Sequence, residues 1–369
     1  MKRAIAIFTV ILFAIALFLT GCAQVVPINE QPDDQGQEQG REPLRVITTI
    51  FPQFDFVRQI AGDRVELSML ISPGAESHGF EPTPRDIIAL NSADLFIYVG
   101  GHGDAWVESI LASLDRDDLR AVALVDLVDT VESDHHHHDH SHGHSHDHSH
   151  DHSHGHDHGH SHDHSHDHDH SHDHDHSHSH DHDHSHDHHH HQGAHLDEHV
   201  WTSPANAVVI VRALSEILAE LDPDNAEYFR ANASAYIDEL QTLHQAFSDV
   251  VAQGVRTTVI FGDRFPFRYL MDAYGLTYYA AFPGCSAETQ ASPATIGFLI
   301  EKVRDEGIPV VFYIEFSNRM IANVIVEDTG AGLLELHSTH NVSHADFMAG
   351  VTYLELMWRN VEHLREALS

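Results

Sequence analysis

The chain of 369 residues carries 57 acidic and 19 basic side chains, a formal net charge of −38, and only two cysteines. This charge argues against nucleic acid as a partner, because phosphates need Lys and Arg, and it favours cations. Two cysteines exclude a fold that depends on a disulfide framework, and the length is sufficient for two ordinary domains.

The N-terminus has the pattern of an export signal. Two basic residues precede an apolar run at residues 4–19, and the sequence Leu-Thr-Gly-Cys22 follows. The run is short for a membrane span, although a retained anchor helix is the alternative, and we expect residues 1–21 to be a signal peptide. The last four residues resemble a bacterial lipobox, which implies cleavage before Cys22 and lipidation of its sulfur. Residues 22–43 then form a flexible tether, which places the protein on the extracytoplasmic face of a membrane.

Short apolar strand patterns alternate with helical patterns along the rest of the chain. The predicted strands are 45–50, 65–71, 95–99, 121–128, 257–261, 276–282, 309–314 and 333–336. The predicted helices are 54–61, 85–92, 106–114, 204–221, 226–253, 268–274, 293–306, 319–329 and 345–368. This alternation predicts an α/β fold with mostly parallel sheets covered on both faces. We expect an N-terminal α/β lobe at 44–221, a long linking helix at 222–253 and a C-terminal α/β lobe at 254–369.

A tract of His alternating with Asp, Ser and Gly interrupts the first lobe. All but nine of the 41 His residues lie between Asp134 and His191. Such a segment has too little apolar surface to offset its ordering entropy, so we expect a disordered insert at 134–195. Imidazole is the commonest side-chain ligand for zinc, copper and nickel, and the tract therefore indicates a metal-binding protein.

Further metal-capable side chains lie outside the tract, mostly directly after predicted strands. They are His78, His102, His199, Asp263, Glu315 and His337. Side chains at the carboxyl ends of parallel strands converge on one edge of a sheet, where α/β proteins bind ligands. The sequence therefore predicts a metal site between the two lobes.

Two of these residues lie in long, specific motifs. His78 begins the segment 78–86, His-Gly-Phe-Glu-Pro-Thr-Pro-Arg-Asp, and His199 lies in the segment 197–207, Asp-Glu-His-Val-Trp-Thr-Ser-Pro-Ala-Asn-Ala. With these motifs, nearly the whole mature chain resembles the cluster A-I solute-binding lipoproteins of zinc and manganese ABC transporters. The resemblance implies that His78 and His199 are metal ligands and that a rigid long helix joins the two lobes. A His-rich insert upstream of the second motif is typical of the zinc-type members.

The resemblance leaves the remaining ligands open. The usual third ligand is a His, but this chain has Asp263 there or, on another alignment, Arg264. A guanidinium has no lone pair for a cation, so we choose Asp263. The usual fourth position falls on His337. Either His340, three residues later, or His102 could replace the missing third ligand.

The resemblance also implies a role in transport. A lipid-anchored monomer would capture Zn²⁺ and deliver it to an ABC permease driven by its ATPase, with no catalysis. Ligands that are mostly imidazole favour Zn²⁺ over Mn²⁺, which remains the alternative metal, and we interpret Glu315 as a partner that orients a ligand imidazole. We expect the tract to collect zinc at weaker sites near the tight one. The rival functions are a secreted zinc enzyme, and a surface metal buffer or adhesin in which the tract itself is the working part.

Overall fold

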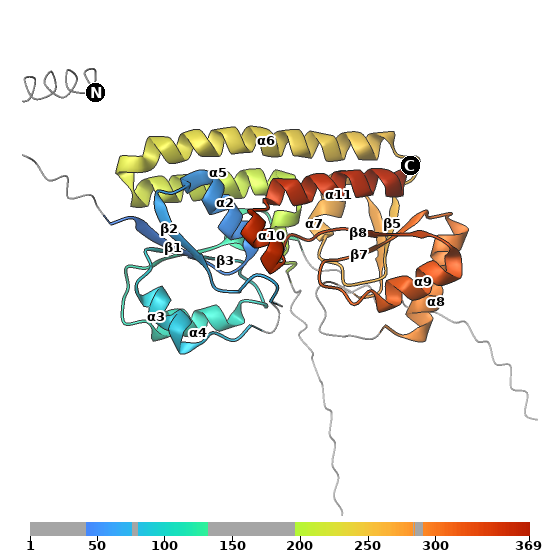
Figure 1. The fold of residues 1–369 in the computed structure, drawn as a ribbon, viewed down its shortest axis with the longest axis horizontal. Coiled ribbons are helices and arrows are strands. Elements are labelled where there is room, and N and C mark those ends of the chain that lie inside the picture. The colour runs from blue at the N-terminus through green and yellow to red at the C-terminus, as the bar shows by residue number, and fades with distance from the viewer. Residues whose placement is uncertain (1–41, 76–79, 132–195, 283, 285–290) are drawn as a thin grey trace, which may run out of the picture. The chain divides into compact units, whose positions relative to one another are not determined.

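The computed structural model describes residues 42–75, 80–131, 196–282, 284 and 291–369 (Figure 1). Several predicted features lie outside these residues: the signal peptide, the predicted lipidation site Cys22, the predicted ligand His78 and the His-rich insert. Within the described ranges, no helix is both long enough and apolar enough to cross a membrane.

The N-terminal lobe contains a four-stranded parallel sheet with the strand order β2-β1-β3-β4. Its elements are β1 (Leu44–Thr48), α2 (Phe51–Ala61), β2 (Val65–Met69), α3 (Pro84–Asn91), β3 (Leu95–Tyr98), α4 (Ala105–Ser113) and β4 (Arg120–Ala123). Alternate strand residues enter different cores, because successive side chains of a strand point to opposite faces. Val46 packs in one core with Phe56 of α2, whereas Ile47 packs in another with Leu90 of α3 and Val107 of α4. The sheet is therefore covered on both faces.

The C-terminal lobe repeats this arrangement with the strand order β6-β5-β7-β8, again all parallel. Its elements are β5 (Thr258–Phe261), α7 (Arg268–Tyr274), β6 (Thr277–Ala280), α8 (Pro293–Asp305), β7 (Val310–Tyr313), α9 (Met320–Thr329) and β8 (Gly332–Glu335). Val259 and Phe312 face the core that the lobe shares with the first sheet, and Ile260 and Val311 face a separate core under α8 and α9. The predicted α/β class with two parallel sheets is confirmed.

Helix α6 (Ala226–Gln253) connects the two lobes. It packs against α2 and α5 (Pro204–Leu221) of the first lobe and against α7 and α11 (Tyr353–Leu368) of the second (Figure 1). The helix contains 28 residues and neither Gly nor Pro, so it runs for about 42 Å without a residue that would kink it. The predicted long helix is confirmed.

The structure corrects two predicted elements. The strand predicted at 121–128 ends at Ala123, which pairs with the last residue of β3, and a 3-10 turn follows at Leu124–Leu127. Gly100, with φ 87°, ends the extended conformation of the neighbouring chain just after β3, although Val125 still donates a backbone hydrogen bond to Val99. The helix predicted at 345–368 is two helices, α10 (His344–Ala349) and α11, because Gly350 adopts φ 78° and ends the first. Local capping here outweighs the helical periodicity of the sequence.

Candidate metal centre

His199 is a buried imidazole with a carboxylate partner. Its ring Nδ1 lies 2.9 Å from Oδ1 of Asp197, and its backbone N–H donates to the same oxygen. Both residues are buried, at 4% and 6% exposure. A carboxylate beside Nδ1 holds the imidazole proton on that nitrogen and places the ring's lone pair on Nε2, the nitrogen through which an imidazole oriented in this way binds a metal.

The electrostatics of Asp197 support this arrangement. Burial alone raises the pKa of Asp197, but the charge and hydrogen bonds of His199 outweigh it, and the pKa lies below its ordinary value. The carboxylate therefore stays ionised at neutral pH. An ionised partner makes the imidazole a stronger base and hence a better metal ligand.

A second imidazole, His340, lies beside His199. The two ring centroids are 5.7 Å apart with nearly perpendicular planes, and Trp201 contacts both rings at 5.4 and 5.1 Å. A zinc ion bonded to both rings at its usual 2.0–2.1 Å would separate the centroids by about 5 to 6 Å. The structure thus brings together two predicted site residues that are far apart in the sequence.

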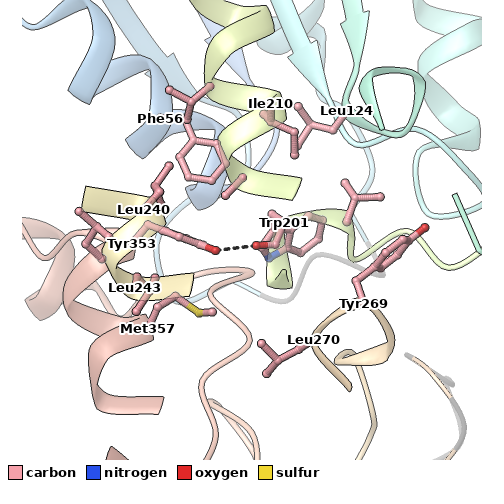
Figure 2. Close-up of a cluster of buried hydrophobic side chains, with 14 of the residues drawn as sticks. Phe56, Leu124, Trp201, Ile210, Leu240, Leu243, Tyr269, Leu270, Tyr353 and Met357 are labelled. Atoms are coloured by element: carbon pink, nitrogen blue, oxygen red, sulfur yellow. Dashed lines mark hydrogen bonds between the residues drawn. The ribbon is translucent and has the colours of Figure 1, made fainter. Parts of the chain in front are cut away.

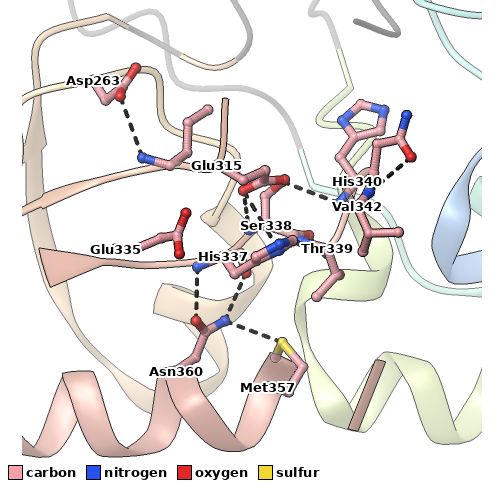
Figure 3. Close-up of polar contacts among 12 residues, drawn as sticks. Asp263, Glu315, Glu335, His337, Ser338, Thr339, His340, Val342, Met357 and Asn360 are labelled. Atoms are coloured by element: carbon pink, nitrogen blue, oxygen red, sulfur yellow. Dashed lines mark hydrogen bonds and ion pairs between the residues drawn. The ribbon is translucent and has the colours of Figure 1, made fainter. Parts of the chain in front are cut away.

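The loop 337–342 presents His340 and is held from the C-terminal lobe by two buried side chains (Figure 3). The carboxylate of Glu315 accepts from the backbone N–H of Ser338, at 2.8 Å, and from its hydroxyl. The side-chain amide of Asn360 accepts from the N–H of His337, at 2.8 Å, and donates to its carbonyl, at 2.7 Å. The sequence suggested Glu315 as the partner of a ligand imidazole. In the structure its carboxylate accepts the hydrogen bonds from the N–H and the hydroxyl of Ser338.

The same loop is also held by residues that belong to the N-terminal part of the chain. The indole N–H of Trp201 donates to the carbonyl of Ser338 at 2.9 Å, and the N–H of Phe51 donates to the carbonyl of His340 at 3.3 Å. Asn341 donates to two carbonyls of the segment that follows β2. The loop is therefore bonded to both lobes.

His337 has a different environment from His340. Its Nδ1 accepts the backbone N–H of Thr339 at 2.9 Å and lies 3.7 Å from Glu315. An imidazole that accepts at Nδ1 carries its proton on Nε2 and has no further lone pair for a metal. Thr339, between the two histidines, is fully buried and adopts φ 59°, which is a strained conformation for a β-branched residue. This turn separates the ring environments of His337 and His340.

The other two candidate ligands, Asp263 and His102, lie on loops other than those that carry His199 and His340. Asp263 is buried, and its two carboxylate oxygens face the N–H groups of Arg264, at 2.9 Å, and Ile314, at 3.4 Å (Figure 3). His102 is exposed on a glycine loop that surrounds the Glu198 side chain, where Gly103 N–H donates to Glu198 at 2.7 Å. Among the residues that the structure describes, no three His, Cys, Asp or Glu side chains form a group that could hold a metal ion.

The described residues that flank the His-rich insert lie next to each other beside His199. Val131 and Asp197 are joined by a backbone hydrogen bond of 3.0 Å. The Tyr269 hydroxyl accepts from the N–H of Val131 and donates to the carbonyl of Asp197. The described residues on the two sides of the insert are therefore joined two residues before His199.

Three supporting residues were missed by the sequence analysis. Asp197 had a usable signal, because a carboxylate two residues before a ligand His can reach its Nδ1. Trp201 and Asn360 had none, because their partners Ser338 and His337 lie 137 and 23 residues away.

Comparison with known proteins gives consistent matches. Residues 46–367 match the family described as zinc-uptake complex component A, periplasmic (ZnuA). The chain is 26% identical to the zinc-binding lipoprotein AdcA of Streptococcus pneumoniae over 95% of its own length, and it spans 58% of that relative. It is also 26% identical to the high-affinity zinc uptake system protein ZnuA of Bacillus subtilis, covering 89% of this chain and 88% of the relative.

Solved structures match the fold over most of the chain. The Zn(II)-bound ZnuA-like domain of Streptococcus pneumoniae AdcA is similar at a TM-score of 0.64 and 24% identity, over 88% of this chain and 99% of that one. A mutant of the laminin-binding adhesin of Streptococcus agalactiae is similar at a TM-score of 0.66 and 21% identity, over 88% and 100%. These likenesses support the arrangement of two parallel α/β lobes.

Proposed function

This chain belongs to the family of periplasmic zinc-uptake components, ZnuA, and on that premise we propose that it captures Zn²⁺ outside the membrane and delivers it to an ABC permease and its ATPase. The family assignment confirms the resemblance indicated by the two long motifs, and it favours a transport protein over an enzyme. Zinc is the metal of the family, in agreement with the imidazole donors of the candidate site.

The observation that carries the proposal is the pairing of His199 with His340. Two buried or half-buried imidazoles, one of them oriented by Asp197, provide half of a tetrahedral zinc site. Beside His199 and His340, we assign His78 as a further zinc ligand on the basis of its motif. Asp263 and His102 are the candidates for the fourth, and the hydrogen bonding of His337 gives it a supporting role.

We propose a separate role for the His-rich insert. The described residues that flank it, Val131 and Asp197, are bonded to each other two residues before His199, so zinc bound anywhere in the insert is held near the tight site by the length of the chain between them. The insert thus raises the local zinc concentration, and its exchangeable sites are weaker than the site at His199 and His340.

Calorimetric zinc titration of four chains, one of them a control, tests these roles. The full chain should bind one zinc tightly and several weakly, and deletion of Asp134–His191 should remove only the weak ones. The double variant His199→Ala, His340→Ala should lose the tight zinc and keep the weak ones. His363→Ala, at a histidine that bonds the carbonyl of Glu335, is the control and should resemble the full chain. A tight zinc retained by the double variant, with unchanged cellular zinc uptake, would favour the metal-buffer function.

We also propose a lipid anchor at Cys22 on a monomeric protein. Cleavage before Cys22 and acylation of its sulfur would hold the protein at the outer face of the membrane near its permease. Cys22→Ser should release the protein from the membrane fraction while leaving zinc binding in solution unchanged. A variant that remains in the membrane fraction would point to a retained N-terminal helix.

A further inference from the structure

Trp201 is connected to both proposed zinc ligands and to the core beneath them. It is fully buried, and its ring contacts those of His199 and His340. Its carbonyl accepts a hydrogen bond of 2.7 Å from the hydroxyl of Tyr353, within the cluster of apolar side chains that Figure 2 shows. Trp201 is thus fixed at its backbone as well as at its ring.

The hydrogen bond from the Trp201 indole to the Ser338 carbonyl joins the loop of His199 to the loop of His340, and each bonded residue is two positions from its histidine. Its donor, Trp201, lies two residues after His199, and its acceptor, Ser338, lies two residues before His340. Besides the direct ring contacts, this bond gives a short path between the two imidazoles, with two residues on each side. A change in its length would therefore be transmitted almost directly to the distance between them.

The acceptor loop needs such support because its conformation is strained. Thr339, which separates Ser338 from His340, is held at φ 59° with a buried β-branched side chain. A conformation of this kind persists only when surrounding contacts enforce it. Glu315 fixes Ser338 relative to the C-terminal lobe, and among the described residues of the loop that carries His199 it is Trp201 that bonds the Ser338 carbonyl.

We propose that Trp201 is a positioning residue that sets the separation of His199 and His340, so that this half of the zinc site is formed before the ion arrives. The inference rests on the proposed function and adds to it the device that fixes the geometry. A preformed pair of ligands binds tightly because little ordering remains to be done on binding. Trp201 itself need not contact the metal.

The variant Trp201→Phe tests this role, because it keeps an aromatic ring and removes the N–H donor. In the chain lacking Asp134–His191, its affinity for Zn²⁺ should fall by about 10- to 100-fold, as for other residues that orient metal ligands. The visible absorption of bound Co²⁺ reports coordination geometry, and its band positions and intensity should change. An unchanged affinity together with an unchanged Co²⁺ spectrum would overturn the proposal.

Two controls separate positioning from general loss of stability. Trp358→Phe makes the same substitution at a partly exposed site on α11, and Phe247→Leu weakens the buried core of α6 away from both loops. Both should bind Zn²⁺ and Co²⁺ as the parent chain does. If Phe247→Leu loses affinity as strongly as Trp201→Phe, the effect is one of stability and the proposal fails.

A change confined to one atom covers the case in which Trp201→Phe does not fold. Replacing the indole by benzothiophene, with Trp106→Phe and Trp358→Phe as background, exchanges the N–H for sulfur and keeps the shape. The same loss of affinity and the same Co²⁺ change are expected, and parent-like binding would overturn the proposal. Absence of tight zinc binding in the parent chain itself would instead refute the proposed function.

Discussion

The two loops that carry His199 and His340 are held in different ways. His199 obtains its orienting carboxylate from Asp197, two residues away. The loop 337–342 obtains its support from Glu315, Asn360 and Trp201, which lie 23 to 137 residues away. The orientation of the His199 imidazole is therefore encoded locally, whereas that of the loop carrying His340 depends on the packing of the whole described chain.

The largest expected effect distinguishes the two histidines of the second loop. His340→Ala should lower zinc affinity by more than about 100-fold, because loss of a ligand exceeds loss of a supporting residue. His337→Ala should lower it by less than about 10-fold, because its Nδ1 is already used as an acceptor. Competition for Zn²⁺ with a chromophoric chelator measures the affinity of both variants. The reverse order of effects would return the ligand assignment to His337.

Asp197→Asn tests the local support of the first loop. The amide keeps the size of the carboxylate and removes its charge, so His199 becomes a weaker base. Zinc affinity should fall by about 10- to 100-fold. The free energy of unfolding of the metal-free protein serves as the companion measurement. A large loss of stability with no change in affinity would show that Asp197 serves the fold and not the site.

Asn360→Ala tests the distant support of the second loop. It leaves the N–H and the carbonyl of His337 without their side-chain partner, and the free energy of unfolding should fall by about 2 kcal/mol or more. Asn232→Ala, which removes one hydrogen bond between α6 and α2, should cost about 1 kcal/mol. Denaturant titration measures the free energy of unfolding of both variants. Equal losses would argue that the loop does not depend on Asn360.

Thr339→Gly should have the smallest effect. Glycine relieves about 1–2 kcal/mol of left-handed strain. It also loses the hydrogen bond from the Thr339 hydroxyl to Ser338, and it raises the entropy of the unfolded chain. The two contributions should leave the free energy of unfolding within about 1 kcal/mol of its original value. A loss of several kcal/mol in the same denaturant titration would show that the turn stores no strain.

The same contrast explains how much the sequence alone could predict. The strands, most helices and the long α6 were found because period-2 and period-3.6 patterns are local, and the errors at Ala123 and Gly350 arose where strand pairing and capping outweighed those patterns. His199 was found because its motif is continuous. The choice of a third ligand among Asp263, His102 and His340 stayed open, because the placement of His340 depends on the backbone angle of Thr339 and on Asn360, which no neighbouring residue reveals.

The hydrogen bonds that join Val131, Asp197 and Tyr269 also bear on how such a protein can evolve. Because the described residues that flank the insert are already side by side, lengthening the chain between them costs only loop-closure entropy, about 0.6 kcal/mol for each doubling. Slippage of a His-Asp-Ser repeat during replication would therefore add or remove repeat units with little penalty to folding. The length of the repeat and the geometry around His199 are thus free to change independently, and a foreign domain could be grafted at the same point.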